Sequence, residues 1–205
     1  MSLRDLADSI PELGHGGRVI EDTLIRFAGL VHPSEVIVDI GPYLGSTTAY
    51  LALGAQPGVT IHAFDTWDAD ICDLRAKSRY YHKTELPQDL RPLFLANLAP
   101  FAARVVTHQG DVRKVTWAGP LIGLFVDDIG VDRHYVEAKM RAFSSHFAPG
   151  AVLVLMDYYW HETKRGEAFD YQRRFVERNA HAFRFLERAG AIAAVFEWEG
   201  GALVY

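Results

Sequence analysis

Short apolar runs alternate with segments of helical periodicity along most of the chain. Five runs are almost continuously apolar: residues 36–40, 59–64, 104–107, 121–126 and 151–156. Continuous rather than alternating hydrophobicity indicates strands that are buried on both faces, as in a parallel sheet that is covered by helices. We therefore expect these five runs to form the parallel part of one sheet.

Helical patterns separate the apolar runs, at residues 19–31, 46–53, 90–101 and 132–147. The last is the clearest, because it carries one apolar stripe formed by Val136, Met140, Phe143 and Phe147. The Pro149-Gly150 dipeptide predicts the end of that helix. An alternation of strands and helices of this kind predicts a doubly wound α/β sheet.

The C-terminal part departs from this alternation. Residues 167–182 predict a helix, and two strand-like runs follow at 192–198 and 202–205, on either side of Glu199-Gly200-Gly201. Two short strands around such a turn predict an antiparallel hairpin. The predicted fold class is therefore α/β: a doubly wound, Rossmann-like, mostly parallel seven-stranded sheet with a C-terminal antiparallel hairpin.

The 205 residues are expected to form a single domain, residues 1–205. Residues 1–34 predict an N-terminal helical cap ahead of the first strand. Residues 66–89 fit the alternation poorly, because they hold Trp67, Tyr80 and Tyr81 among many charged residues. We expect an insertion there that forms a lid over the mouth of a ligand site.

Charge and composition narrow the class of protein. The formal net charge of −5 argues against a nucleic-acid surface, and the densest basic stretch, residues 173–188, is typical of a solvated helix face. No run approaches the about 20 apolar residues of a membrane span, and the N-terminus lacks a signal-peptide core. The single cysteine, Cys72, cannot form an internal disulfide, so we expect a reducing, cytoplasmic location. A two-fold homodimer is common among soluble proteins and stays a possibility here.

The most informative segment is the turn after the first predicted strand. That strand carries Asp39 near its end, and Gly41 and Gly45 then form a Gly-x-x-x-Gly turn that opens a helix. Glycine lets the backbone approach a ligand closely, and Ser46 or Thr47 is predicted to cap the helix. Ligands bind at this carboxyl edge of α/β sheets.

A second acid, Asp65, ends the second predicted strand, twenty residues after Gly45. An acid there can accept hydrogen bonds from both hydroxyls of a ribose. Asp39 adds negative charge nearby, which disfavours a cofactor that carries phosphate and favours one with an amino group and a sulfonium.

With these features the chain resembles the class I S-adenosylmethionine-dependent methyltransferases, and within them the small O-methyltransferase-like families that include macrocin-type sugar and catechol-type enzymes. The resemblance runs from residue 36 to residue 158. The matching segments are residues 39–47, Phe64-Asp65, Gly110-Asp111-Val112, residues 124–127, residues 149–154 and Asp157-Tyr158.

The resemblance implies S-adenosylmethionine as the cofactor. It implies that Asp39 and Gly41 face the methionine part. It implies further that Asp65 binds the ribose and Asp111 the adenine amino group. The full set of cofactor-binding residues that it implies is Asp39, Gly41, Tyr43, Gly45, Ser46, Asp65, Thr66, Trp67, Asp111, Val112 and Asp127.

A hydroxyl acceptor must lose a proton during methyl transfer, so a general base or a metal ion is needed. Relatives hold Mg²⁺ with carboxylates at the positions of Asp127 and Asp157, and oxygen ligands suit that ion. This chain departs from the pattern, because Met156 stands where relatives often carry an acid and the stretch after Asp127 is longer. Both a Mg²⁺-dependent and a metal-free site therefore stay open.

The catalytic candidates are His134, His161 and Asp127. His134 opens the helix after the fourth strand, where the family often has a histidine, and His161 follows the fifth strand. His62 lies inside a predicted strand and is expected to be structural. The aromatic residues nearest the predicted mouth are Tyr43, Trp67, Tyr158, Tyr159 and Trp160. Packing is the expected role for most of them, and some could line an acceptor pocket.

The expected reaction is O-methylation of a small hydroxylated metabolite, with N-methylation open. An NAD-dependent oxidoreductase is an alternative, although its Gly-x-Gly-x-x-Gly turn is replaced here by Gly-Pro-Tyr-Leu-Gly. A methyltransferase-like domain that binds the cofactor or a partner without catalysis is the second alternative.

Overall fold

The computed structural model describes residues 2–12, 17–69, 87–130, 132–163 and 169–205. Most of the lid expected at residues 66–89, with Cys72, Tyr80 and Tyr81, lies outside the described residues. Within the described ranges, no helix is long and apolar enough to cross a membrane.

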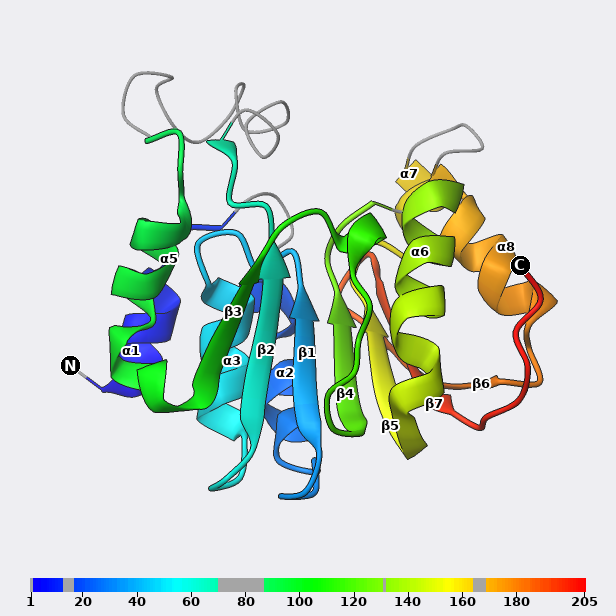
Figure 1. The fold of residues 1–205 in the computed structure, drawn as a ribbon, viewed down its shortest axis with the longest axis horizontal. Coiled ribbons are helices and arrows are strands. Elements are labelled where there is room, and N and C mark those ends of the chain that lie inside the picture. Colours follow the sequence, from blue (N-terminus) through cyan, green and yellow to red (C-terminus); the bar gives the residue numbers. More distant parts are fainter. Residues whose placement is uncertain (1, 13–16, 70–86, 131, 164–168) are drawn as a thin grey trace.

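The described residues form one seven-stranded sheet, in the order β3-β2-β1-β4-β5-β7-β6 (Figure 1). The strands are β1 (Val36–Ile40), β2 (Thr60–Asp65), β3 (Val105–Gln109), β4 (Ile122–Asp127), β5 (Phe147–Leu155), β6 (Phe183–Ala189) and β7 (Ala193–Trp198). The first five are parallel, whereas β7 runs antiparallel to both β5 and β6. This confirms the predicted fold class.

Helices cover both faces of the sheet. They are α1 (Leu3–Ser9), α2 (Glu21–Ala28), α3 (Ser46–Gly54), α5 (Arg91–Asn97), α6 (Arg133–Phe143), α7 (Trp160–Thr163) and α8 (Tyr171–Arg178). Short 3₁₀ helices span Gly17–Ile20, Ala99–Arg104, Val112–Lys114 and Ser144–His146. In Figure 1, α6 lies in front of the sheet, and α2 and α3 lie behind it.

Two hydrophobic cores result, one on each face. Successive side chains of a strand point to opposite faces, so Ile37 packs with the α2 and α3 side while Val38 packs with the α6 and α8 side. Because both faces are covered, all five β1 residues are buried. This explains why β1 is a continuous apolar run interrupted only by Asp39.

The C-terminal hairpin differs from the predicted one. It pairs β6 with β7 across a turn at residues 190–192, in which Gly190 has a φ of 58°. Residues 202–205 form no strand, and the side chain of Asn179 instead bonds both main-chain groups of Val204. The sequence pattern did not predict strand β6. This strand is a sheet edge, and exposed charged residues such as Arg184 and Arg188 interrupt its apolar positions.

The Pro149-Gly150 dipeptide does not end a helix. Helix α6 ends at Phe143, and β5 already begins at Phe147. The dipeptide is exposed inside β5, at an irregularity where the register with β4 shifts. Gly150 has a φ of 79° there, in the left-handed region that glycine adopts readily.

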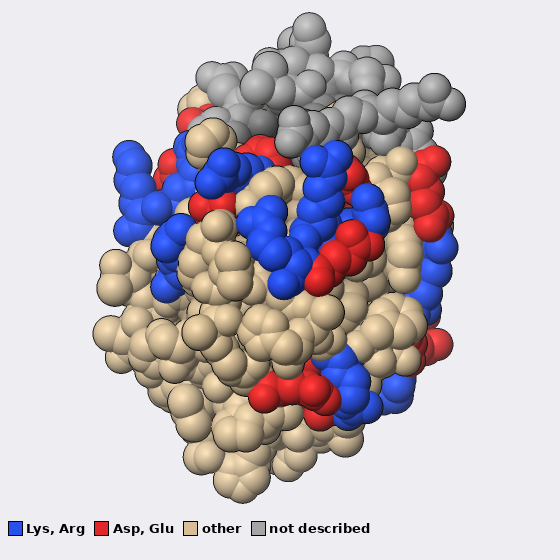
Figure 2. All heavy atoms as spheres, turned by 90° about the vertical axis from the view of Figure 1, so that its right-hand side faces the viewer, with Lys and Arg blue, Asp and Glu red and all other residues tan. Residues whose placement is uncertain are grey.

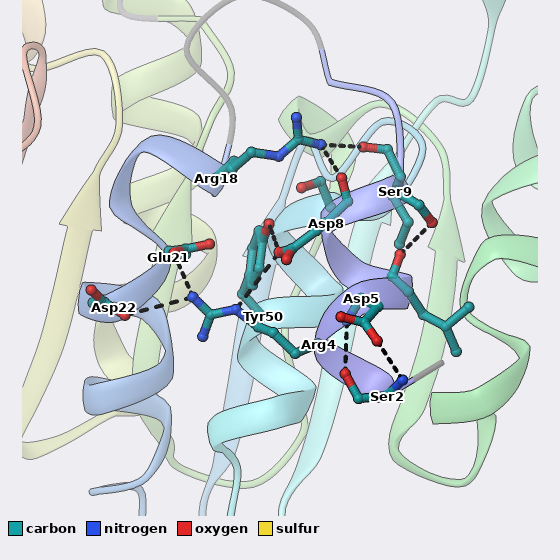
Figure 3. Close-up of polar contacts among 12 residues, drawn as sticks. Ser2, Arg4, Asp5, Asp8, Ser9, Arg18, Glu21, Asp22 and Tyr50 are labelled. Atoms are coloured by element: carbon teal, nitrogen blue, oxygen red, sulfur yellow. Dashed lines mark hydrogen bonds and ion pairs between the residues drawn. The ribbon is translucent and has the colours of Figure 1, made fainter.

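The N-terminal segment packs on α3, and Figure 3 shows the polar contacts of this region. Ala7 and Ile10 are buried. Asp8 accepts a hydrogen bond from the Tyr50 hydroxyl at 2.9 Å, and its main-chain carbonyl accepts one from Arg18. These contacts attach the cap to the helix that starts at the glycine turn.

Basic and acidic side chains interleave on the face that carries α6 and α8 (Figure 2). Glu137 forms ion pairs with Arg133 and Arg141, and Asp170 forms ion pairs with Arg173 and Arg174. The basic stretch that begins at residue 173 is therefore a solvated face whose first two arginines are paired.

Candidate active site

The turn between β1 and α3 lies where the strand order reverses. The chain continues from β1 to β2 and β3 on one side and then returns to β4 on the other. The carboxyl ends of the strands at such a reversal form the usual ligand crevice of an α/β sheet. Gly41 and Gly45 have φ values of 80° and 100°. A Cβ atom on Gly41 would lie 2.1 Å from Cγ2 of Ile129, so this position accepts only glycine.

Asp65 joins this turn to the end of β2. Its Oδ2 accepts a hydrogen bond from the Tyr43 amide at 3.0 Å, and its Oδ1 accepts one from the Trp67 amide at 2.8 Å. Burial raises the pKa of Asp65, and these main-chain donors oppose the rise. Thr66 adds a longer hydroxyl contact of 3.4 Å to the same carboxylate. Asp65, the residue predicted to bind the ribose, thus lies beside the glycine turn.

Asp39 is fully buried beneath the turn. Its Oδ2 accepts a hydrogen bond from the Thr48 hydroxyl at 2.6 Å, and no donor among the described residues reaches its Oδ1. Burial raises the pKa of Asp39 to about 7, and the charge of Asp65 adds to the rise. A buried carboxylate oxygen without a donor favours a cationic group of a ligand.

The start of α3 differs from the prediction. Gly45 is the N-cap residue and no side chain caps the helix, so the expected cap by Ser46 or Thr47 is wrong. The Ser46 hydroxyl instead donates to Glu12, which also accepts a hydrogen bond from the Arg18 amide at 2.6 Å. Ser46 is therefore occupied by the N-terminal segment.

Asp128 also lies at the carboxyl edge of the sheet, although the sequence analysis does not name it among the candidate site residues. Burial and the negative charges of Asp157, Asp39, Asp127 and Glu12 raise its pKa well above the ordinary value. Its amide donates to the carbonyl of Ile40 at 3.0 Å, which fixes it beside the end of β1. The signal in the sequence is that two consecutive acids end the fourth strand, and only the first is matched by the resemblance.

Asp127, which is predicted to take part in catalysis, cofactor binding and metal binding, is bonded to two other side chains of the protein. Its Oδ1 accepts a hydrogen bond from Lys139 Nζ at 2.6 Å, and its Oδ2 accepts one from Gln172 Nε2 at 3.2 Å. Its side chain is only 1% exposed. Both oxygens are thus engaged inside the protein. The described residues contain no group of three His, Cys, Asp or Glu placed to hold a metal ion, so the Mg²⁺ site expected at Asp127 and Asp157 finds no support.

Asp111 and Val112 lie at the end of β3. Asp111 caps the 3₁₀ helix that starts at Val112, and its carboxylate accepts hydrogen bonds from the Arg113 amide and side chain. The Arg113 guanidinium lowers the pKa of Asp111. The amide of Gly110 donates a hydrogen bond to the carbonyl of Asp65 at 2.8 Å. This bond brings the turn after β3 close to Asp65.

The two candidate bases differ in their surroundings. His134 is exposed on the first turn of α6. His161 is half-buried, and its Nδ1 lies 3.0 Å from the Tyr158 carbonyl. Because a carbonyl only accepts hydrogen bonds, the neutral ring carries its proton on Nδ1, and its Nε2 then has the lone pair that a general base needs.

Most of the aromatic side chains named as candidates near the mouth of the site pack inside the protein. Trp67 is fully buried against Phe94, with ring centroids 4.8 Å apart. Tyr158 is buried against Phe196, whereas Tyr159 and Trp160 are half-buried. His62 of β2 and His108 of β3 lie on neighbouring strands, and His62 Nδ1 is 2.9 Å from His108 Nε2.

No family model matches the sequence, and no curated protein matches it. Solved structures do match over nearly the whole chain. The O-methyltransferase TomG of Streptomyces achromogenes, involved in tomaymycin synthesis and solved with SAM, has a TM-score of 0.65 at 16% identity, covering 97% of this chain and 89% of its own. An O-methyltransferase of Bacillus cereus solved with SAH has a TM-score of 0.60 at 15% identity, with coverages of 96% and 89%. A protein of Corynebacterium glutamicum has a TM-score of 0.68 at 15% identity, with coverages of 98% and 89%. The chain therefore has the fold of the class I S-adenosylmethionine-dependent O-methyltransferases.

Proposed function

We propose that this chain transfers a methyl group from S-adenosylmethionine to a hydroxyl of a small molecule. One observation carries the proposal: Asp39 and Asp65 flank the glycine turn at the point where the strand order reverses. This is the ligand crevice of the fold, and the matched TomG structure was solved with SAM.

The charge of the crevice supports this cofactor. Asp39, Asp65 and Asp128 place three carboxyl groups at one edge, where burial raises their pKa values and a cationic ligand group would favour the charged carboxylates. Such charge favours an ammonium and a sulfonium and disfavours the pyrophosphate of NAD. In our proposal Asp39 and Gly41 face the methionine part, Asp65 the ribose, and Asp111 with Val112 the adenine.

The bound cofactor would supply an activated methyl group on a sulfonium sulfur. The acceptor hydroxyl would have to lose its proton as it takes that methyl group. The hydroxyl proton would pass to Nε2 of His161, since its Nδ1 is held by Tyr158. His134 stays the alternative base, although it is exposed.

A small polyhydroxyl or phenolic metabolite is our proposed acceptor. A cytoplasmic location and a homodimer stay predictions from the sequence, as does the lack of a nucleic-acid or membrane partner. A domain that binds the cofactor without catalysis would show binding but no methyl transfer to any acceptor.

The decisive experiment is calorimetric titration of the folded protein with S-adenosylhomocysteine. We expect micromolar binding, weakened at least about tenfold in Asp65→Ala, because the ribose would lose charge-assisted hydrogen bonds. Asp22→Ala is the matched control, since the Asp22 side chain is 93% exposed on α2. Absence of binding by the folded wild type, or tight binding of NAD instead, would rule the proposal out.

A further inference from the structure

Helix α6 buries a lysine in its apolar face. Asp132 caps this helix, and its buried residues are Val136, Lys139, Met140 and Phe143. The Lys139 side chain is 0% exposed. An ammonium group is removed from water at this position only when oxygen partners replace its hydration.

Three oxygen atoms surround the ammonium of Lys139. Its Nζ donates to Asp127 Oδ1 at 2.6 Å, to the Gly130 carbonyl at 3.0 Å and to the Ile129 carbonyl. Three donors on Nζ are thereby matched by three acceptors. One carboxylate and two carbonyls on one loop are the kind of oxygen set that binds a hard cation, and here a side chain of the protein supplies that cation.

The loop that Lys139 holds touches the candidate active site. Asp128 lies between Asp127 and Ile129, which both bond Lys139. A Cβ atom on Gly41 would meet both Ile129 Cγ2 and the Asp128 carbonyl. The Met156 amide donates to the Asp127 carbonyl at 2.9 Å, which joins the end of β5 to the same loop. Lys139 therefore fixes the backbone on which Asp128 stands.

We propose that Lys139 is a built-in cation that replaces a divalent metal ion at Asp127, so that this site works without Mg²⁺. Lys139 is a positioning residue: it holds Asp127 and the carbonyls of Ile129 and Gly130, and through them it keeps Asp128 and the glycine turn in place. The replacement of the metal ion stands on these contacts alone, whereas the effect on the cofactor rests on the proposed function.

The first test uses the wild-type protein and Mn²⁺, followed by electron paramagnetic resonance. We expect no binding at millimolar Mn²⁺, and S-adenosylhomocysteine affinity that is the same with EDTA and with Mg²⁺. Wild-type Mn²⁺ binding that Asp127→Asn abolishes would overturn the inference. This readout does not depend on methyltransferase function, so the two proposals can fail separately.

The second test removes the cation. Lys139→Ala should bind Mn²⁺, and the ion should raise its melting temperature, because it fills the set of oxygens that the ammonium leaves. Lys139→Ala/Asp127→Asn should bind none. Lys114→Ala is the control, since Lys114 is exposed.

A folded Lys139→Ala protein that binds no Mn²⁺ would show that Lys139 is only a structural ion-pair partner and would overturn the inference. Should Lys139→Ala not fold, the wild-type titration still decides it. We also expect S-adenosylhomocysteine affinity to fall about tenfold in Lys139→Ala, to recover with Mn²⁺, and to stay unchanged in Lys114→Ala.

Discussion

The indole Nε1 of Trp67 donates a hydrogen bond to the main-chain carbonyl of Tyr43 at 2.9 Å. The φ angle is 48° at Trp67 and 51° at Tyr43, and residues other than glycine rarely adopt such positive values. The bond therefore joins two strained positions, one after β2 and one in the glycine turn. Asp65 bridges the same two residues through their amides. The shape of the candidate cofactor site thus depends on hydrogen bonds among its own residues.

Replacing Trp67 by Phe should loosen the glycine turn. The Tyr43 carbonyl would lose its donor, and we expect a loss of about 1–3 kcal/mol in the free energy of unfolding, measured with urea. Trp117→Phe is a matched control, because the buried Trp117 indole also donates to a carbonyl, that of Pro120, at 3.0 Å. Both variants should be destabilised, but only Trp67→Phe should bind S-adenosylhomocysteine more weakly. Equal effects on binding would contradict this role.

The two glycines Gly45 and Gly58 separate backbone strain from crowding. Both have positive φ values, 100° and 93°, but a Cβ atom would lie 2.8 Å from Leu98 Cδ2 at Gly45 and would meet nothing within 4 Å at Gly58. Gly58→Ala should cost about 1 kcal/mol from strain alone. Gly45→Ala should cost about 2–4 kcal/mol, because overpacking is added. Urea unfolding of both variants measures the difference, and equal losses would show that α5 shifts freely.

The buried carboxyl of Asp39 predicts a pH-dependent stability. Its pKa is about 7 in the folded protein, against an ordinary value of 3.8. The folded state keeps a proton that the unfolded state loses between these values, so the contribution of Asp39 to stability is full below about pH 4 and is lost as pH rises to about 7. The total loss is on the order of 4 kcal/mol.

Asp39→Asn should therefore remove this dependence, since the amide does not ionise and can still accept the hydrogen bond from Thr48. We expect the variant to gain stability relative to the wild type at pH 8 and not at pH 4, as measured by urea unfolding at both values. Asp22→Asn, on an exposed side chain, should follow the wild type. A wild-type-like pH profile in Asp39→Asn would show that Asp39 is ionised throughout.

The apolar runs were sufficient to predict the parallel part of the sheet. Strands β1 and β4 are buried on both faces and have no solvent side to interrupt them, and β3 kept an apolar run although it is a sheet edge. The same reasoning could not predict β6. That strand forms an edge, and Phe185 is 51% exposed beside charged neighbours, so its residues do not differ from those of a solvated segment. The run at residues 192–198, which was predicted to be the first strand of the hairpin, is therefore its second strand, β7.

The sequence by itself determined the five parallel strands and the positions of Asp39, Gly41, Gly45 and Asp65 at or just after their carboxyl ends, since these follow from local patterns and from the direction of parallel strands. Only the tertiary structure shows the different surroundings of Asp127 and Asp128, which are consecutive at the end of β4. Lys139 lies twelve residues after Asp127, and α6 must pack back against the sheet before their charges meet. Burial and ion pairing depend on distances in space, so neighbouring acids with the same local sequence acquire different partners and different roles.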